Sequence, residues 1–425
     1  MTTRLDSIQT TELSNTNRRT GWVDRLARRI VHAQLENLRT GQIVVSDGDS
    51  QHTFGQLTDE FPLTVQVRIF DPSFYRDIAF GGTIGAGEAY IQGHWACGEL
   101  GDLLRILIRN RDVLETMDSG LGRLGAPLQK LLHALNRNTP AGSRKNIAAH
   151  YDLGNDFYQL WLDQRMMYSS AYFDSPETSL EDAAVAKLDR ICRKLDLAED
   201  VSVIEIGTGW GGFAIHAARH YGCHVTTTTI SQQQYDYAKQ AICAAGLEDR
   251  ITLLLKDYRD LEGNFDKLVS IEMIEAVGHE YHDAYFSKCC ELLKADGQML
   301  LQAITIADQR YDEYKTSVDF IKRYIFPGGC LTSVTDMTRT MTRHTDMRVI
   351  HLEDIGPHYA TTLDRWHQRF LARIDEVRAL GYSESFIRMW QFYLAYCESA
   401  FAERSIGDVQ MLIMRPSARC EHVRY

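Results

Sequence analysis

The sequence has no run of about 18 apolar residues, the length that a helix needs to cross a bilayer. Its first twenty residues also lack the apolar stretch of a secretory signal peptide. The nine cysteines form no C-x-x-C pair, so neither a zinc site nor a disulfide framework is indicated. We therefore expect a cytoplasmic protein whose thiols are reduced.

Positive charge is scarce as well, because 46 basic side chains stand against 57 acidic ones and give a net charge of −11. A protein that binds nucleic acid needs a basic face for the phosphates, so we expect no nucleic acid partner. Residues 103–145 are an exception, with eight basic side chains against three acidic ones, a local charge of +5. This segment could rest on anionic lipid headgroups, and a solvated basic linker explains it equally well.

The length of 425 residues fits about two domains. Apolar residues recur at helical spacing over 22–38, and residues 42–80 alternate as short strands do, which predicts a small mixed α+β domain. The glycine cluster at 81–87 has no following Lys-Ser/Thr pair, so we interpret it as a turn or link and not as a phosphate loop. The expected division is an N-terminal domain over 1–116, a linker over 117–145 and a larger domain over 146–425.

Strand-like and helix-like segments alternate in the larger domain, a pattern typical of a parallel sheet wrapped by helices. The fold class is therefore α/β, with a doubly wound sheet in which ligands bind beyond the carboxyl ends of the strands. The expected strands are 201–206, 223–230, 251–255, 267–273 and 299–306, and the expected crossover helices include 232–245 and 281–293.

The segment VIEIGTGWGG at 203–212 sets an apolar strand against a glycine-rich turn that opens a helix. Its glycines also match the loose dinucleotide pattern G-x-G-x-x-G. A dinucleotide site has an Asp or Glu about 20 residues further on, but residues 226–231 read TTTTIS. Glu205 lies before the turn instead, as in methyltransferases that use S-adenosylmethionine.

Several longer motifs occur in order, and together they resemble the cyclopropane fatty acid synthase family, which includes bacterial phospholipid enzymes and mycolic acid cyclopropane synthases. The likeness covers nearly all of residues 146–409 and, more loosely, the N-terminal domain through GEAYIQGHW (87–95). The motifs are HYDLGNDFYQLWLD (150–163), YSSAYF (168–173), EIGTGWGG (205–212), TISQQQ (229–234), IEMIEAVGHEYHDAYF (271–286), YIFPGGCLTS (324–333) and HYATTL (358–363).

The resemblance implies a class I methyltransferase fold that transfers the methyl group of S-adenosylmethionine to the cis double bond of a phospholipid acyl chain and closes a cyclopropane ring. It also implies an N-terminal domain for lipid binding and membrane association, a homodimer, and peripheral attachment to the inner face of the membrane. Candidate membrane surfaces are the helix over 22–38, the basic linker and the aromatic segment around Trp390, which could equally line an acyl tunnel.

The cofactor-binding residues that the resemblance implies lie in four segments of the sequence. Gln234 would take the place of the usual acid on the ribose, in agreement with the missing carboxylate at 226–231. The full set is Tyr168, Ser169, Glu205, Gly207, Gly209, Thr229, Gln234, Asp257, Tyr258 and Arg259.

In the resembled enzymes a bicarbonate ion acts as the base that takes the methyl proton. The matching positions here are Ser170, Glu275, Gln302, the backbone of Ile304, and Tyr359. The family usually has Cys at the position of Ser170, His at that of Gln302 and often His at that of Ala276. Ser and Gln can still donate hydrogen bonds to an oxyanion, but the imidazole is lost as a proton acceptor.

Two alternatives therefore stay open beside ring closure. Loss of a proton from the acyl chain would give a methylene- or methyl-branched product, and a protein that keeps the cofactor fold without catalysis would bind lipid only. We predict no metal site, because the histidines at 216, 220 and 224 and those at 279 and 282 lack H-E-x-x-H spacing or a third ligand.

Overall fold

The computed structural model describes residues 21–119 and 153–419, which group into two compact units. The first unit holds residues 21–119 and 381–403, and the second holds 153–380 and 404–419. The sequence-based division assigns 381–403 to the larger domain, whereas its contacts lie with the first unit. The roles given to the domains remain predictions, and most of the expected linker lies outside the described residues.

The first unit is a mixed α+β structure, as the sequence predicts. A four-stranded sheet in the order β2-β1-β3-β4 packs with helices, and helix α16, from near the C-terminus, contacts α2 and α3. The strands are β1 (Gly41–Asp47), β2 (Ser50–Gln56), β3 (Thr64–Ile69) and β4 (Trp95–Cys97). The helices are α1 (Trp22–Leu35), α2 (Ser73–Ile91), α3 (Leu100–Arg109), α4 (Arg111–Ser119) and α16 (Glu384–Ala402).

The glycine cluster at 81–87 lies inside helix α2, so its interpretation as a turn or link is wrong. Gly82 has φ +60° and kinks the helix, a conformation that suits glycine. At Gly85 an added Cβ would lie 1.9 Å from the carbonyl oxygen of Asp77. The glycines therefore allow a kink and a close backbone approach, which the spacing of apolar residues does not reveal.

The second unit is built on a seven-stranded sheet in the order β10-β11-β9-β8-β5-β6-β7. The neighbours from β9 to β7 pair in parallel, while β11 and β10 are antiparallel to their neighbours at one edge. The strands are β5 (Ser202–Ile206), β6 (His224–Thr229), β7 (Ile251–Leu255), β8 (Phe265–Ile271), β9 (Leu293–Ile306), β10 (Arg348–Asp354) and β11 (Ile406–Met414). All five predicted strands are confirmed, and β10 and β11 are additional.

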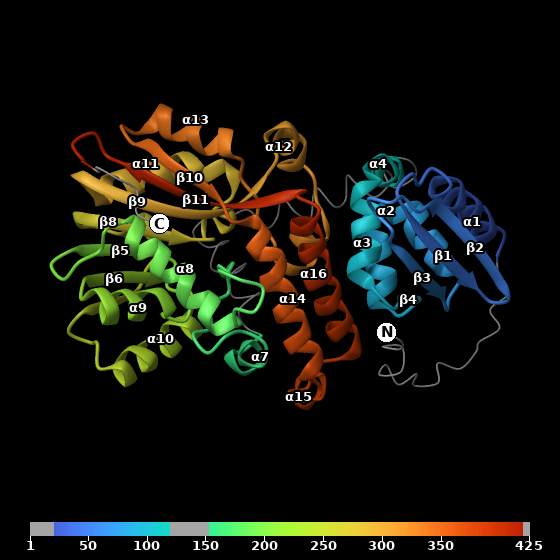
Figure 1. Ribbon diagram of the computed structural model, residues 1–425, viewed down its shortest axis with the longest axis horizontal. Coiled ribbons are helices and arrows are strands. Elements are labelled where there is room, and N and C mark those ends of the chain that lie inside the picture. The colour runs from blue at the N-terminus through green and yellow to red at the C-terminus, as the bar shows by residue number, and fades with distance from the viewer. Residues whose placement is uncertain (1–20, 120–152, 420–425) are drawn as a thin grey trace. The chain divides into compact units, whose positions relative to one another are not determined.

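Helices cover both faces of this sheet, as the doubly wound prediction requires (Figure 1). The longer ones are α8 (Leu180–Lys194), α9 (Gly212–Tyr221), α10 (Gln232–Ala245), α11 (His282–Leu292), α13 (Val334–His344) and α14 (Gly356–Ala372). The shorter ones are α7 (Asn155–Gln159), α12 (Asp308–Tyr314) and α15 (Ile374–Ala379). None of the described helices is both long and apolar enough to cross a membrane.

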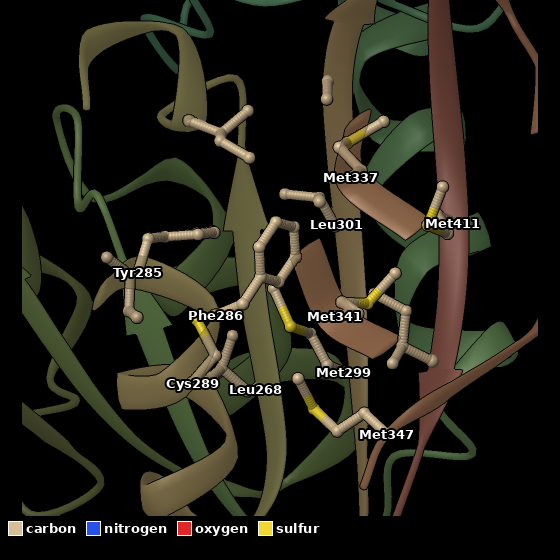
Figure 2. Packing of buried hydrophobic residues seen from close by; sticks show 14 of the residues in the cluster. Leu268, Tyr285, Phe286, Cys289, Met299, Leu301, Met337, Met341, Met347 and Met411 are labelled. Atoms are coloured by element: carbon tan, nitrogen blue, oxygen red, sulfur yellow. The ribbon is translucent and has the colours of Figure 1, made fainter. Parts of the chain in front are cut away.

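The core lies in two layers, one on each face of the sheet. Side chains of α8, α9 and α10 pack on one face around Val203. On the other face, α11 and α13 contribute Phe286, Met337 and Met341, which meet Met299 and Met411 from β9 and β11 (Figure 2). Because helices bury both faces, a central strand such as β5 has consecutive buried residues, 203–206, instead of alternating buried and exposed ones.

The chain order in the sheet reverses between β5 and β8, which are direct neighbours. In sheets of this kind the ligand site lies beyond the carboxyl ends of the strands at this reversal. The turns after β5 and β8 are in contact there, because an added Cβ at Gly207 would lie 3.3 Å from the Met273 side chain.

Candidate active site

The glycine turn after β5 has a backbone that favours glycine at three positions. Gly207, Gly209 and Gly211 have φ values of +103°, +53° and +93°, and α9 begins at Gly212. An added Cβ at Gly209 would have no described atom within 4 Å, whereas one at Gly212 would lie 2.4 Å from Met167 Sδ. Gly212 is thus fixed by packing, while Gly209 borders open space where a ligand can approach the backbone.

Glu205, on the strand that leads into this turn, is buried and bonded within the protein. Its Oε2 accepts a hydrogen bond of 2.6 Å from the hydroxyl of Thr227 on β6. Burial raises the pKa of Glu205 to about 8, although the Thr227 hydrogen bond and the Lys187 charge act to lower it. Lys187 is itself fully buried, which lowers its pKa to about 8, and its Nζ donates to Ser169 Oγ at 2.8 Å.

The other predicted cofactor residues lie at the ends of β6 and β7. Thr229 Oγ1 donates to Gln234 Oε1 at 2.8 Å, so these two residues are brought together at the start of α10. Asp257, Tyr258 and Arg259 share the turn after β7, where Arg259 donates to both carboxylate oxygens of Asp257 at 2.8 and 2.7 Å. The Asp257 carboxylate is therefore already held by an arginine.

Tyr168 lies in an aromatic cluster. The ring centroids of Tyr158, Trp161 and Trp366 are 5.4 to 5.5 Å from that of Tyr168. Trp210 packs against Tyr158, and its indole N–H donates to Asn155 Oδ1 at 2.7 Å. These rings provide aromatic faces beside the glycine turn, and such faces attract a cationic group.

Glu272, which the motifs do not single out, is the centre of the polar cluster. It follows β8 directly, and its Oε1 accepts hydrogen bonds from the backbone N–H of Ser170 at 2.8 Å and from Gln302 Nε2 at 2.7 Å. Its Oε2 accepts a hydrogen bond of 2.7 Å from the hydroxyl of Tyr359. Three of the five predicted catalytic positions are therefore bonded to one carboxylate of the chain itself.

Glu275 lies three residues after Glu272 and is bonded to Ile304, another of the predicted catalytic positions. Its Oε1 accepts a hydrogen bond of 2.5 Å from the backbone N–H of Ile304. Its Oε2 is buried and has no hydrogen-bond partner among the described residues. Burial, followed by the negative charge of Glu272, raises the pKa of Glu275 to about 8.

A third carboxylate, Asp408 on β11, lies behind this pair. Gln302 Nε2 also donates to Asp408 Oδ2 at 3.0 Å, and Gln302 Oε1 accepts from Gln410 Nε2 at 3.1 Å. This network follows from the antiparallel register, which places Gln302 opposite Gln410. Burial, followed by the charge of Glu272, raises the pKa of Asp408 well above its ordinary value.

The structure thus brings the predicted catalytic residues together in two groups, while their roles remain predictions. Ser170 takes part through its backbone N–H, because its hydroxyl donates to the Ala171 carbonyl at 3.0 Å. The motifs in the sequence do not indicate a role for Glu272, Asp408 or Lys187. The repeated acids in the segment IEMIE were the one signal available for Glu272.

The histidines considered as metal ligands have other partners. His216 Nε2 is bonded to Asp189 at 2.8 Å, and His282 Nδ1 is bonded to Asp336 at 3.0 Å. Within residues 21–119 and 153–419, no group of three His, Cys, Asp or Glu side chains has a geometry that could hold a metal ion.

Comparison with known proteins finds a matching family and similar sequences. The family described as mycolic acid cyclopropane synthetase matches residues 139–411. A cyclopropane-fatty-acyl-phospholipid synthase of Escherichia coli is 38% identical over 354 residues, which are 82% of this chain and 87% of the relative. A tuberculostearic acid methyltransferase of Mycobacterium tuberculosis is 37% identical over 358 residues, which are 80% of this chain and 81% of the relative.

Among solved structures, a mycolic acid cyclopropane synthase complexed with SAH and CTAB is similar with a TM-score of 0.60 and 31% identity. The match covers 64% of this chain and 98% of the other. The family match over residues 139–411 includes the glycine turn and the carboxylate cluster.

Proposed function

The chain belongs to the mycolic acid cyclopropane synthetase family, and from that premise we propose that it is an S-adenosylmethionine-dependent C-methyltransferase that forms cyclopropane rings on phospholipids. The substrate is the cis double bond of an unsaturated acyl chain. The match to a cyclopropane-fatty-acyl-phospholipid synthase over most of both chains supports this substrate. The observation that carries the proposal is the cluster of Glu272, Glu275 and Asp408 beside the glycine turn, at the reversal of strand order.

S-adenosylmethionine supplies an electrophilic methyl group on a cationic sulfonium. The residues present fit this cofactor, because the backbone at Gly209 borders open space and aromatic rings surround Tyr168. The residues proposed to hold it are Tyr168, Ser169, Glu205, Gly207, Gly209, Thr229, Gln234, Asp257, Tyr258 and Arg259. Glu205 would act by fixing the β5 end of the turn, since its own carboxylate is bonded to Thr227.

The chemistry requires a site that holds a weak nucleophile in line and excludes water. An alkene attacks slowly, and the carbocation formed from it reacts with any water present. The aromatic cluster around Tyr168 offers faces that stabilise positive charge, while the carboxylates offer acceptors for the proton that is lost. Ring closure follows when that proton comes from the transferred methyl group.

The deciding experiment incubates the purified protein with unsaturated phospholipid vesicles and a cofactor that carries a trideuterated methyl group. Ring closure predicts one added carbon, retention of two of the three deuteriums and no alkene signal in the NMR spectrum of the product. A branched product with an alkene signal, or one that keeps all three deuteriums, would contradict ring formation. An unchanged lipid together with intact cofactor binding would favour a non-catalytic lipid-binding protein.

Product analysis has particular value because one similar protein is named a tuberculostearic acid methyltransferase. The match to the phospholipid cyclopropane synthase has slightly higher identity and covers more of both chains. We therefore retain the ring as the proposed product.

Peripheral attachment to the inner face of the membrane is part of the proposal, because a phospholipid acyl chain does not leave the bilayer freely. Helix α1 supports this: Ala27, Val31 and Leu35 are buried, while Trp22 and Leu26 are 71% and 49% exposed. An exposed apolar pair one turn apart is typical of a helix that lies at a bilayer surface. The family resemblance further supports a homodimer.

A further inference from the structure

The bicarbonate ion implied by the family resemblance does not fit the cluster as it stands. An ion at that place would need donors from Ser170, Gln302 and Tyr359. The structure shows the Ser170 N–H, Gln302 Nε2 and the Tyr359 hydroxyl all donating to the carboxylate of Glu272, at 2.8, 2.7 and 2.7 Å. A side chain of the protein therefore fills the position that the resemblance assigns to the ion.

We propose that Glu272 is the catalytic base of this chain, and that its carboxylate replaces bicarbonate, so that the reaction proceeds without added bicarbonate. The inference rests on the proposed function, since it concerns the proton lost after methyl transfer. A glutamate carboxylate and bicarbonate share a planar group with two acceptor oxygens, so the same donors suit either. Oε1 of Glu272 already accepts two hydrogen bonds, whereas Oε2 accepts one and keeps acceptor capacity for a proton.

Charge in the cluster also argues against a further anion. Glu272, Glu275 and Asp408 influence one another strongly enough that Glu272 raises the pKa of both neighbours. Lys187 is a buried cation whose charge acts on both Glu272 and Asp408. Bicarbonate would add another negative charge beside three buried carboxyl groups that already disfavour one another's ionisation.

The backbone at Glu272 supports a functional role. Its φ is +48°, in the left-handed region that glycine adopts freely and other residues avoid. Strain of this kind persists where the surrounding structure fixes it, and it gathers at functional sites. The same strain makes Glu272→Gly a mild change for the backbone, although it removes the whole carboxylate and opens space beside its three donors.

Gln302 is matched to this arrangement. The amide nitrogen Nε2 of Gln302 carries two N–H bonds, and it donates to both Glu272 and Asp408. Its oxygen accepts from Gln410, whose own oxygen accepts from Lys194 Nζ at 2.8 Å. Gln302 therefore positions Glu272 while it satisfies the second carboxyl group, which one ring nitrogen of histidine, with a single N–H, could not do.

The proposed step balances without another reactant. Methyl transfer to the alkene leaves a cation on the acyl chain. The Glu272 carboxylate forms an O–H bond with a proton of the new methyl group, the C–H bond breaks, and its electron pair forms the C–C bond that closes the ring. Glu272 then returns its proton to solvent before the next turnover.

The test measures methyl transfer to phospholipid vesicles in buffer freed of carbon dioxide, with and without added bicarbonate. The wild-type rate should change less than about twofold, because the base is part of the chain. Glu272→Gln should lose about 10²- to 10⁴-fold in rate, the usual contribution of a general base. Glu272→Gly should lose as much without bicarbonate and recover at least tenfold of that loss with it.

A matched control is Glu262→Gly, which makes the same change at an exposed residue and should leave the rate unchanged in both buffers. A second readout is binding of ¹³C-bicarbonate followed by NMR. Glu272→Gly should bind the ion, and the wild-type protein should not. Cofactor affinity measured by calorimetry verifies that each variant is folded. If a variant is not folded, the bicarbonate dependence of the wild-type rate and the binding of bicarbonate to the wild-type protein still test the inference.

A wild-type enzyme that needs bicarbonate or binds it would overturn the inference, as would a Glu272→Gln variant of normal rate. These outcomes differ from failure of the proposed function, in which the wild-type protein transfers no methyl group in either buffer. In that case bicarbonate binding by the wild-type protein still tests whether Glu272 fills the ion's position.

Discussion

The hydroxyl of Tyr359 donates a hydrogen bond of 2.7 Å to Glu272 Oε2, joining residues 87 positions apart in the sequence. Tyr359 is a buried residue in the first turn of α14, and Glu272 lies in the turn after β8. This contact joins α14, which packs against β11, to the turn after β8, where the strand order of the sheet reverses. The orientation of the Glu272 carboxylate therefore depends on the docking of α14.

Tyr359→Phe should lower the rate of methyl transfer about 10- to 100-fold, the effect of losing a hydrogen bond to a charged group. The Tyr359 hydrogen bond lowers the pKa of Glu272, which burial holds above its ordinary value. Without it the pKa rises further, and a base must be ionised to act, so the acid limb of the pH–rate profile should move to higher pH. Tyr382→Phe makes the same change just before α16, outside the carboxylate cluster, and as the control it should leave the profile in place. A profile that does not move in Tyr359→Phe would separate Tyr359 from the base.

Glu275→Gln should reduce the rate about 10²- to 10⁴-fold. Glutamine keeps an acceptor for the Ile304 N–H, but it cannot take up or release a proton and lacks the second oxygen, which is buried without a described partner. Cofactor affinity, measured by calorimetry, should stay within about twofold, because the change lies beyond β8 and not in the glycine turn. Loss of cofactor binding and of rate together would mean that Glu275 has a structural role instead.

The sequence predicts the parallel part of the sheet well because each strand there is rich in apolar or β-branched residues and is followed by a turn. It does not predict β10 and β11, which pair with distant segments: β11 pairs with β9 about 100 residues earlier. Asp408 was missed for that reason, since its place in the cluster depends on β11. The motifs give Glu275 and Tyr359, but the role of Glu272 depends on a positive φ and on donors from three separate segments.

Glu205→Gln should change how the stability of the fold depends on pH. Burial raises the pKa of Glu205 from 4.5 to about 8, so its contribution to stability is complete below pH 4.5 and is lost as pH rises toward 8. Over that window the free energy of unfolding of the wild-type protein, relative to the variant, should fall by up to about 1.4 kcal/mol per pH unit. Urea unfolding of both proteins at pH 5.5 and 7.5 measures this difference. An identical pH dependence in the two proteins would mean that Glu205 does not titrate in this range.

Gly209→Val should weaken S-adenosylmethionine binding at least tenfold, because the added side chain projects into the open space beside the glycine turn. The matched control is Gly246→Val at the end of α10, where φ is +66° and an added Cβ also meets no described atom within 4 Å. Both changes carry similar backbone strain, but the control leaves the turn intact. Equal cofactor affinity in the two variants, measured by calorimetry, would place the ligand elsewhere.

Trp22→Ala combined with Leu26→Ala should weaken vesicle binding about tenfold or more, because large apolar side chains gain about 1.5–3 kcal/mol each when they leave water. Both residues are exposed on the face of α1 opposite its buried stripe. Leu57→Ala, which changes a side chain 51% exposed in the same unit, is the control and should bind as the wild-type protein does.

Binding to vesicles should also strengthen with anionic lipid and weaken with salt, since exposed charges are screened over about 8–10 Å at physiological ionic strength. The charge in question includes the basic segment 103–145, of which residues 120–145 lie outside the described residues. Flotation that is equal for neutral and anionic vesicles at every salt concentration would leave α1 as the membrane contact and remove any electrostatic role of that segment. Flotation that is unchanged in the α1 double variant would instead exclude α1.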